Sequence, residues 1–234
     1  MNHMCSSDRT RSECLRCDIR KAVLFAELTP DDIARMFLPV SQVVAEVGDS
    51  LFEEGDCGGA IYTIREGVVK LVQYQPDGGQ RIVRLLGAGS TIGLEALVDQ
   101  PYEHHAIALQ DVRACRIPVE EVHRLCVETP RLYRQLMRRW HDSIRLADEW
   151  LTNMSTGSAR TRLARLFLYL TQDGRHQRCG LFRREDLGAM LGISTETASR
   201  MVADFKRTGT IRQLRRNMYE CDVNGLRAIA SDGP

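Results

Sequence analysis

Short hydrophobic runs separated by glycine dominate the chain from residue 40 to about residue 118. The runs recur at intervals of roughly 8 to 12 residues, as expected of strands joined by tight turns. They are Val43–Val44, Ser50–Phe52, Ala60–Ile64, Val68–Val72, Ile82–Leu86 and Ala106–Ala108. Turn-forming Gly, Pro and Asp residues stand between them, for example at residues 76–79. This pattern predicts a small antiparallel β domain, a sandwich or a barrel.

The spacing of apolar residues becomes helical after this region. From residue 119 to residue 154 glycine is absent, and one apolar stripe comprises Val122, Leu125, Leu132, Leu136, Trp140, Ile144, Ala147 and Leu151. A stripe on a helix of more than 20 residues must be buried, either against its own domain or against the same helix of a second subunit. The length favours a homodimer. The small polar residues and glycine at positions 155–158 predict a hinge, and another helix is predicted over residues 159–170.

Two short amphipathic helices joined by a tight turn are predicted between residues 185 and 208. Gly192 is expected to adopt a positive φ in this turn, and Ser194 to cap the second helix. The second helix should bury Ala198, Met201, Val202 and Phe205. Near its N-terminal end it should expose Thr195, Glu196, Ser199 and Arg200. This is a helix-turn-helix pattern, whose second helix enters the major groove of DNA.

A two-stranded wing is predicted after the second helix. Residues 211–214 and 218–221 have strand character, and the basic turn Arg215-Arg216-Asn217 lies between them. Basic side chains at such a tip can contact phosphates.

The net charge of +1 conceals a separation of charge along the chain. Residues 1–154 carry 18 Lys and Arg against 23 Asp and Glu, a net charge of −5, whereas residues 155–234 carry 14 against 8, a net charge of +6. A basic C-terminal part joined to an acidic N-terminal part is typical of a nucleic-acid-binding domain attached to a sensing module.

The composition excludes several classes of protein. With 43% hydrophobic and 27% charged residues, the chain is neither disordered nor collagen-like. No apolar run approaches the ~20 residues that span a bilayer, so no membrane association is predicted. Residues 1–6 lack the apolar core of a signal peptide. We therefore expect a cytoplasmic protein.

The order of these features resembles the superfamily of the cyclic-AMP receptor protein and the fumarate and nitrate reduction regulator (CRP/FNR). The resemblance covers nearly the whole chain and rests on the helix-turn-helix with Glu196-x-x-Ser199-Arg200, on the segment Tyr62–Leu71 and on the long connecting helix. It implies an α+β fold with an N-terminal antiparallel β-roll like that of cyclic-nucleotide-binding domains, a long dimerisation helix and a C-terminal winged helix-turn-helix domain.

The expected domain boundaries follow from the same comparison. A cysteine-containing segment covers residues 1–28, and the β-roll sensor domain covers residues 29–118, with a helix start at Thr29–Asp32. The dimerisation helix covers residues 119–154, and the DNA-binding domain covers residues 155–234.

Thr195-Glu196 and Ser199-Arg200 resemble the FNR subgroup rather than the cyclic-AMP receptor protein. The resemblance implies a dimer on double-stranded DNA that contains an inverted repeat close to TTGAT-N4-ATCAA. Glu196 would accept from cytosine, Arg200 would donate to guanine and Ser199 would touch thymine, roles that base-edge chemistry permits. In the alternative interpretation, Glu196 is an acid favoured by the helix dipole, and Arg200 pairs with it at i,i+4.

Cyclic AMP is not the expected effector. Superfamily members that bind it hold its phosphate with a Gly-Glu-Leu segment followed by Arg-Ser. The matching residues here are Gly93-Leu94-Glu95 and then His104-His105. Without that guanidinium there is no bidentate clamp for the phosphate. Adjacent strand residues point to opposite faces, so His104 and His105 are not expected to ligate a haem or a metal together.

Eight cysteines in a chain without a secretion signal indicate reduced thiols suited to metal or redox chemistry. Cys14-x-x-Cys17 and Cys115 match parts of the set with which oxygen-sensing superfamily members ligate a [4Fe–4S] cluster. Val23 stands where that set has another cysteine, and Cys5 lies on a short polar segment that can loop back. The predicted ligands are therefore Cys5, Cys14, Cys17 and Cys115. Structural roles are predicted for Cys57, Cys126, Cys179 and Cys221.

These features predict a transcription regulator in which an intact cluster favours the DNA-binding dimer, and oxygen or nitric oxide releases DNA. Exposed β-roll loops such as residues 76–79 are candidate contacts for RNA polymerase. No catalytic triad, phosphate-binding glycine loop or paired-carboxylate motif is present in the sequence, so no enzyme is expected. The alternatives for the sensor are a thiol switch, an unidentified small ligand, and a constitutive regulator whose sensor is vestigial.

Overall fold

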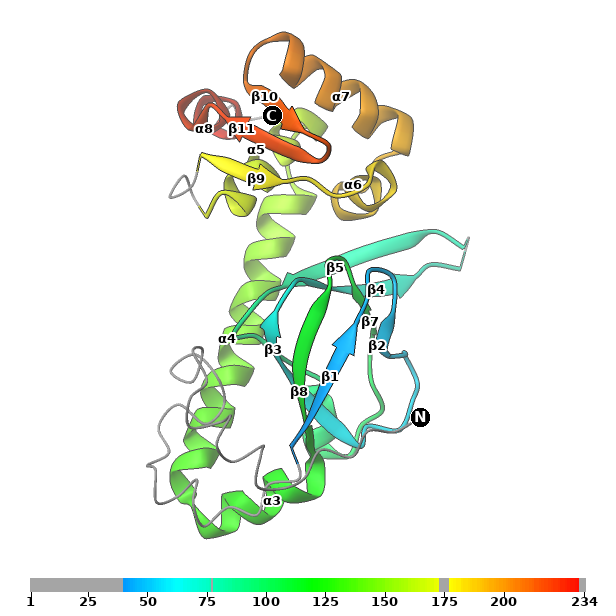
Figure 1. Cartoon of the computed structure of the whole chain (residues 1–234), viewed down its shortest axis with the longest axis vertical. Coiled ribbons are helices and arrows are strands. Elements are labelled where there is room, and N and C mark those ends of the chain that lie inside the picture. The colour runs from blue at the N-terminus through cyan, green and yellow to red at the C-terminus, as the bar shows by residue number, and fades with distance from the viewer. Residues whose placement is uncertain (1–39, 77, 173–176, 232–234) are drawn as a thin grey trace. The chain divides into compact units, whose positions relative to one another are not determined.

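The computed structural model describes residues 40–76, 78–172 and 177–231 (Figure 1). The predicted helix start at Thr29–Asp32 and the N-terminal cysteine segment lie outside these residues. The chain divides into two compact units, one built mainly from residues before Leu146 and one mainly from Leu146 onward. None of the helices in the described ranges is long and apolar enough to cross a membrane.

The first unit is built on two four-stranded sheets. One sheet has the order β1-β8-β3-β6, and the other has the order β2-β7-β4-β5. The strands are β1 Ser41–Ala45, β2 Ser50–Phe52, β3 Ala60–Glu66, β4 Val69–Tyr74, β5 Gln80–Leu86, β6 Thr91–Ile92, β7 His105–Ala108 and β8 Val112–Pro118. The pairs β1–β8, β3–β8, β3–β6, β2–β7 and β4–β7 are antiparallel. The prediction of an antiparallel β domain is confirmed.

Two strands were not among the predicted runs. β6 has only two residues, too few to show a pattern. β8 alternates buried Val112, Ala114 and Ile117 with more exposed residues that include two arginines, and these interrupt its hydrophobic run. β8 is nevertheless central to its sheet, because it pairs with both β1 and β3.

The predicted helix over residues 119–154 is two helices in the structure. α3 spans Val119–Glu128 and α4 spans Pro130–Ser155, with Thr129 between them at φ −135 and ψ 86. The break has a local cause, because proline disfavours the helical conformation of the residue before it and begins a helix readily. The prediction of one continuous helix was therefore wrong at Thr129.

α3 and the beginning of α4 cover a hydrophobic face of the sheet that contains β8. The buried cluster there comprises Val40, Ile61, Ile117, Val122, Leu125, Leu132 and Leu136. Ile61 and Ile117 are direct cross-strand partners on β3 and β8, and the other members come from the chain before β1 and from the two helices. Burial of each aliphatic side chain contributes about 1.5–3 kcal/mol, so the two helices are held firmly on this face.

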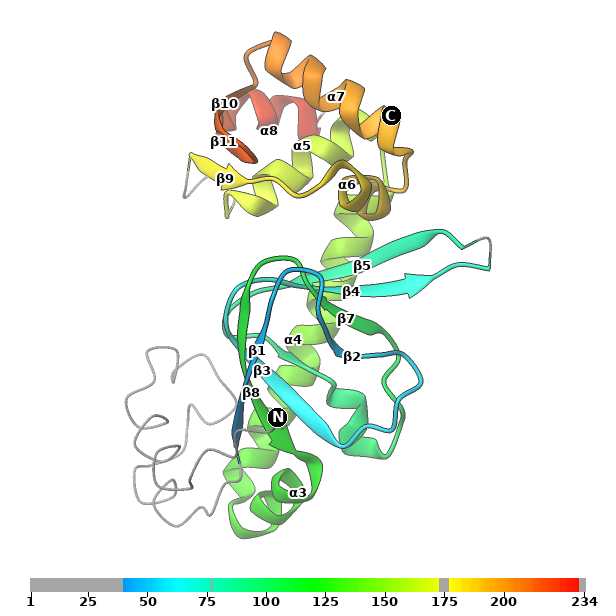
Figure 2. The same cartoon turned by 45° about the vertical axis from the view of Figure 1, so that its right-hand side comes forward.

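The second unit contains a helix-turn-helix and a small sheet. Its elements are α5 Ala159–Leu170, β9 Arg178–Gly180, α6 Arg184–Leu191, α7 Thr195–Arg207, β10 Ile211–Arg215, β11 Met218–Cys221 and α8 Val223–Ser231. The sheet order is β10-β11-β9, so the predicted two-stranded wing has a third strand. α8 packs against α5 (Figure 2). Buried Phe167 and Phe205 join α5 to α7, with ring centroids 6.1 Å apart.

Candidate nucleic-acid interface and sensor residues

The turn between α6 and α7 has the geometry expected of a helix-turn-helix. Gly192 ends α6 at φ 62 and ψ 46, a left-handed conformation that costs glycine little. Gly188 lies against this turn, and a Cβ atom there would come 2.7 Å from the carbonyl oxygen of Ile193. The hydroxyl oxygen of Ser194 accepts from the backbone N–H of Thr197 at 3.2 Å. The predicted positive φ and the predicted N-cap are both confirmed.

The predicted DNA-contacting residues share one exposed surface at the N-terminal end of α7. Thr195, Glu196, Ser199 and Arg200 are all exposed. Ala198, Val202 and Phe205 are buried on the other side, and Met201 is half-buried. Residues at i and i+4 lie above one another on a helix, so Thr195 aligns with Ser199, and Glu196 with Arg200. We call these four exposed residues the recognition face.

Hydrogen bonds favour the ionised form of Glu196. The pKa of its carboxyl lies below its usual value, mainly because the carboxylate accepts from its own backbone N–H and from the Ser194 hydroxyl, with Arg200 as a smaller electrostatic cause. An ionised carboxylate is an acceptor only, as contact with a cytosine amino group requires. Arg200 donates to the Thr197 hydroxyl at 3.4 Å. The recognition face therefore presents an acceptor and a cation side by side.

Sequence analysis did not identify the residues that hold α7 on α5. Asp204, in the last turns of α7, forms ion pairs with Arg160 of α5 and with Arg207. The Arg160 guanidinium carbon also lies 5.2 Å from the centroid of the Phe205 ring, a cation–π geometry. Arg207 and then Arg160 lower the pKa of Asp204. A signal was present, since an acid near a helix C-terminus is unfavourable without a cationic partner.

The wing carries two exposed cations at its tip. Arg215 and Arg216 are exposed, and Asn217 turns the hairpin at φ +57. Arg212 is paired, because its Nε donates to Glu220 at 3.0 Å. Lys206 of α7 donates to Gln213 of β10 at 2.9 Å, which joins the wing to the recognition helix. Arg215 and Arg216 have no acidic partner in the part of the chain that the structure describes.

The segment that matches a cyclic-nucleotide clamp has a different chemistry here. Gly93 adopts φ 76 and precedes a 3-10 helix, η2 Leu94–Val98. Burial, then Arg84 and His105, lower the pKa of His104 to about 4, so its ring is neutral near pH 7. His105 Nε2 lies 3.7 Å from Glu54 Oε2. Arg84, which sequence analysis did not single out, donates to Ser143 of α4 at 2.5 Å.

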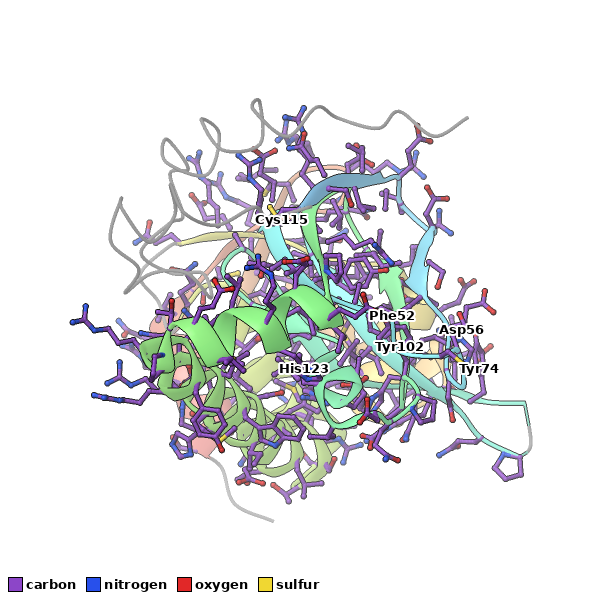
Figure 3. The ribbon with its side chains drawn as sticks, turned by 90° about the horizontal axis from the view of Figure 1, so that it is seen from below. Phe52, Asp56, Tyr74, Tyr102, Cys115 and His123 are labelled. Atoms are coloured by element: carbon purple, nitrogen blue, oxygen red, sulfur yellow. The ribbon has the colours of Figure 1, made fainter. Side chains whose placement is uncertain are left out.

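Cys115 lies in the middle of β8, half-buried, with Gln42 and Thr63 as its cross-strand partners. It packs against the hydrophobic cluster that includes Leu132 and Leu136 of α4. The Thr63 hydroxyl is buried beside it and has no hydrogen-bond partner among the residues that the structure describes. Figure 3 shows Cys115 apart from the aromatic side chains of Phe52 and Tyr102, whose rings stack with centroids 3.9 Å apart.

Of the four predicted ligands of a [4Fe–4S] cluster, one lies in the part of the chain that the structure describes. Cys115 supplies one half-buried sulfur, and the buried Thr63 hydroxyl, which has no hydrogen-bond partner among the described residues, lies in the next strand. Both features suit an iron–sulfur group, whose sulfur atoms accept hydrogen bonds. Cys5, Cys14 and Cys17 lie outside the described residues. Within residues 40–76, 78–172 and 177–231, no three His, Cys, Asp or Glu side chains are grouped as metal ligands.

Two family models match the chain. Residues 42–129 match the cyclic nucleotide-binding domain, and residues 161–229 match the Crp-like helix-turn-helix domain. The fumarate and nitrate reduction regulatory protein of Vibrio cholerae is 31% identical over 169 residues, which cover 69% of this chain and 67% of that protein. The transcriptional activator protein anr of Pseudomonas aeruginosa is 27% identical over 227 residues, which cover 94% of this chain and 93% of that protein.

Solved structures share the fold. FixK2 from Bradyrhizobium japonicum has a TM-score of 0.74 at 18% sequence identity, covering 83% of this chain and 99% of that chain. A CRP-family transcriptional regulator from Thermus thermophilus has a TM-score of 0.71 at 21% identity, covering 82% of this chain and 97% of that chain. These likenesses confirm the predicted α+β architecture.

Proposed function

Because the chain belongs to the CRP/FNR family of transcription regulators, we propose that it binds an inverted repeat as a homodimer under the control of an N-terminal [4Fe–4S] cluster. The family identifies the chain as a helix-turn-helix DNA-binding protein and not as an enzyme. The observation that carries the proposal is the recognition face of α7, which is exposed, bears an ionised acceptor beside a cation and is capped by Ser194.

The proposed DNA site is close to TTGAT-N4-ATCAA. Glu196 accepts from the amino group of cytosine, Arg200 donates to guanine, and Ser199, with Thr195 beside it, contacts thymine. Arg215 and Arg216 contact phosphates, which adds affinity without specificity. A dimer fits such a repeat because its two-fold axis matches the symmetry of the DNA.

The dimer interface of the proposal is a largely exposed apolar stripe on α4, which shares four residues with the stripe that the sequence predicts. Tyr133, Met137, Ile144 and Leu151 are 59%, 46%, 52% and 63% exposed. Together with half-buried Trp140 and Ala147, they alternate by four and three residues. That is the spacing of a coiled-coil seam, which a second copy of the helix covers. Large apolar side chains at this spacing are unfavourable in water without a partner.

The proposed sensor is a cluster held by Cys5, Cys14, Cys17 and Cys115, with Cys5 in place of the ligand lost at Val23. When bound, the cluster supplies iron sites that link the N-terminal cysteines to β8 and that react with oxygen or nitric oxide. Cys115 would hold this group from β8, where its side chain packs against the hydrophobic residues that include Leu132 and Leu136 of α4. A change at Cys115 therefore reaches the dimer helix through packed side chains.

The energy that such a switch needs is modest. A shift of the DNA-binding population from 1:99 to 99:1 requires about 5.5 kcal/mol of differential stabilisation. Several relatives bear names that agree with this sensing role, such as the anaerobic regulatory protein of Haemophilus influenzae, which is 29% identical over 184 residues. We further propose that cyclic AMP is not the effector, because His104 and His105 replace its phosphate clamp.

Exposed loops of the β-roll are the proposed contacts for RNA polymerase. The β4–β5 connection is one candidate, and Tyr74 at its edge is 54% exposed.

The test is anaerobic purification followed by iron and acid-labile sulfide analysis, visible absorption and DNA binding, before and after exposure to air. We expect about four irons per subunit, a sulfur-to-iron charge-transfer band that bleaches in air, and loss of binding to the repeat. A colourless, iron-free protein that binds the repeat in air would overturn the cluster proposal. Thiols, an unidentified ligand or a constitutive regulator would then account for the sensor domain. Failure to bind the repeat in either state would overturn the DNA assignment.

A further inference from the structure

Two cysteines of the second unit face each other inside the small sheet. The Sγ atoms of Cys179 and Cys221 are 3.6 Å apart, although the residues are 42 positions apart in the chain. Both side chains are buried, each 5% exposed. The sequence prediction gave both residues structural roles. Both cysteines are free in the structure.

Strand pairing explains why the two thiols meet. β9 and β11 are antiparallel, with Tyr219 opposite Cys179. Cys221 lies two residues beyond Tyr219 and so points to the same face as Cys179. The backbone N–H of Cys221 donates to the carbonyl of Gln177 at 2.8 Å, which fixes the register at this end. The two cysteines are therefore diagonal neighbours across one strand pair.

The chemistry of the pair is unequal. The hydrogen bond between the two thiols, in which either sulfur can donate, lowers the pKa of Cys221 against the effect of burial. The same hydrogen bond, together with burial, raises the pKa of Cys179. Cys221 is the stronger nucleophile of the two, because the thiolate and not the thiol attacks an oxidant.

We propose that Cys179 and Cys221 form a reversible disulfide, with a peroxide as the oxidant. The Cys221 thiolate attacks one oxygen of hydrogen peroxide, so that an S–O bond forms, the O–O bond breaks, and hydroxide leaves and takes up a proton as water. Cys179 then attacks the resulting sulfenic sulfur and loses its proton, the S–S bond forms, and the S–O bond breaks to release a second water. Two thiols are oxidised by two electrons, and one peroxide is reduced to two waters.

Access to the buried pair comes through β9. This strand has three residues and lies at the edge of its sheet, where it pairs with β11. Short edge strands open locally at low free-energy cost compared with a central strand. Because the two thiols face each other across the β9–β11 pair, opening of β9 would uncover both, and Cys221 would stay in the β10–β11 hairpin.

The disulfide would enclose the DNA-reading elements in one covalent loop. Residues 179–221 include α6, α7 and the wing, so the bond joins the two ends of the helix-turn-helix unit. Closing a loop of about 40 residues disfavours the unfolded chain by an entropic effect. Closure also moves β9 against β11, whose Tyr219 hydroxyl accepts from Arg184 at the start of α6 at 3.2 Å. The proposal does not depend on the iron–sulfur cluster.

The test maps the disulfide in the full-length protein. The reduced chain is treated with a few equivalents of hydrogen peroxide, remaining thiols are alkylated, and the chain is digested with trypsin without reductant. Trypsin cleaves after Arg178, Arg183, Arg216 and Arg227. We expect peptide 179–183 linked to peptide 217–227, lighter by two hydrogen atoms than the separate peptides and separated again by dithiothreitol.

Exposed Cys57 serves as an internal control for the oxidant. Oxidised Cys57 together with fully alkylated Cys179 and Cys221, or with a partner for Cys221 other than Cys179, would overturn the proposal. The oxidised protein should also melt at a higher temperature than the reduced one. Dithiothreitol should abolish this difference, and Cys179→Ser should remove it, whereas Cys126→Ser should retain it. Equal melting temperatures despite a mapped disulfide would contradict the proposed stabilisation.

Discussion

At the scale of single residues, the recognition face depends on neighbours that are close in sequence. Ser194 caps α7, Glu196 is held ionised by that cap and by its own backbone, and Arg200 follows one turn later. The residues that make these contacts are at most six positions apart in the chain, so their proximity could be predicted from the sequence. Arg160 is different, because its contact with Asp204 spans 44 positions and requires α5 and α7 to be packed together.

Replacement of Arg200 by alanine should remove discrimination at the guanine of each half-site. We expect a loss of about 1–3 kcal/mol for each half-site of the matching DNA and little loss on a site whose guanines are replaced. The matched control is Arg215→Ala, which should weaken binding to both sites equally and reduce the salt slope by about one for each subunit. Fluorescence anisotropy with both DNA sites at several salt concentrations measures these effects. An unchanged base preference in the Arg200 variant would contradict the assignment.

His104 should make the first unit less stable in mild acid. Burial lowers its folded-state pKa to about 4, against an ordinary value of 6.5. Well above pH 6.5 the ring is neutral in both states, so it contributes no pH dependence there. As the pH falls from 6.5 toward 4, the unfolded chain takes up a proton that the folded chain excludes, and the free energy of unfolding declines.

Urea unfolding of wild type and His104→Gln between pH 7.5 and about 4 measures this effect. The variant should lose less stability over that interval, by on the order of 2 kcal/mol once the partial exposure of the ring is allowed for. Parallel pH profiles for the two proteins would show that His104 is solvated and accessible to protons in the folded state.

At the scale of elements, α4 combines two kinds of apolar surface. Leu132 and Leu136 are buried in the hydrophobic cluster that they share with α3. Ile144 and Leu151, further along α4, are 52% and 63% exposed. The sequence shows one long stripe and cannot separate these two roles, because both follow helical periodicity. The break at Thr129 belongs to the same scale, since Pro130 sets it locally.

Replacement of Ile144 by glutamate should dissociate the proposed dimer. Each dimer buries two copies of this side chain, at about 1.5 kcal/mol or more apiece, so we expect the dissociation constant to rise by roughly 100-fold. The matched control is Val127→Glu, at an 84% exposed position of α3 outside the stripe. Light scattering after size-exclusion chromatography measures the mass of both variants. A dimeric Ile144→Glu protein would show that another surface joins the subunits.

At the scale of the whole molecule, the separation of charge has a functional meaning. The acidic part before residue 155 includes the residues that match the cyclic nucleotide-binding domain, and the basic part after it carries the helix-turn-helix. Polyanionic DNA favours the second part and disfavours the first, which orients the encounter. α4, Pro130–Ser155, is the helix that continues from one unit into the other.

Replacement of Cys115 by serine should prevent cluster assembly without unfolding the chain. The side chain is half-buried and similar in size to serine, so a small loss of stability is expected, about 1 kcal/mol. Iron content and visible absorption after anaerobic purification should fall to background, and anaerobic binding to the repeat should weaken. Cys126→Ser is the control, because Cys126 borders the same hydrophobic cluster on α3 and is no predicted ligand. Equal iron content in the two variants would exclude Cys115 as a ligand.

The sequence by itself determined the features that short-range interactions control. Glycine and proline set the turns, alternation and helical periodicity set most strands and helices, and the Ser194 cap and the left-handed Gly192 are local choices of the backbone. The exposure of the recognition face followed from periodicity alone.

Only the tertiary structure decided the features that depend on distant segments. β8 pairs with β1 and β3, which places Cys115 beside Thr63 and close to the helices. β9 joins β11, which brings together Cys179 and Cys221. Arg84 lies near His104, and Arg160 holds Asp204, across long stretches of chain. Strand register and packing determine these contacts. A hydrophobic pattern within one strand or helix carries no information about which distant segment pairs with it.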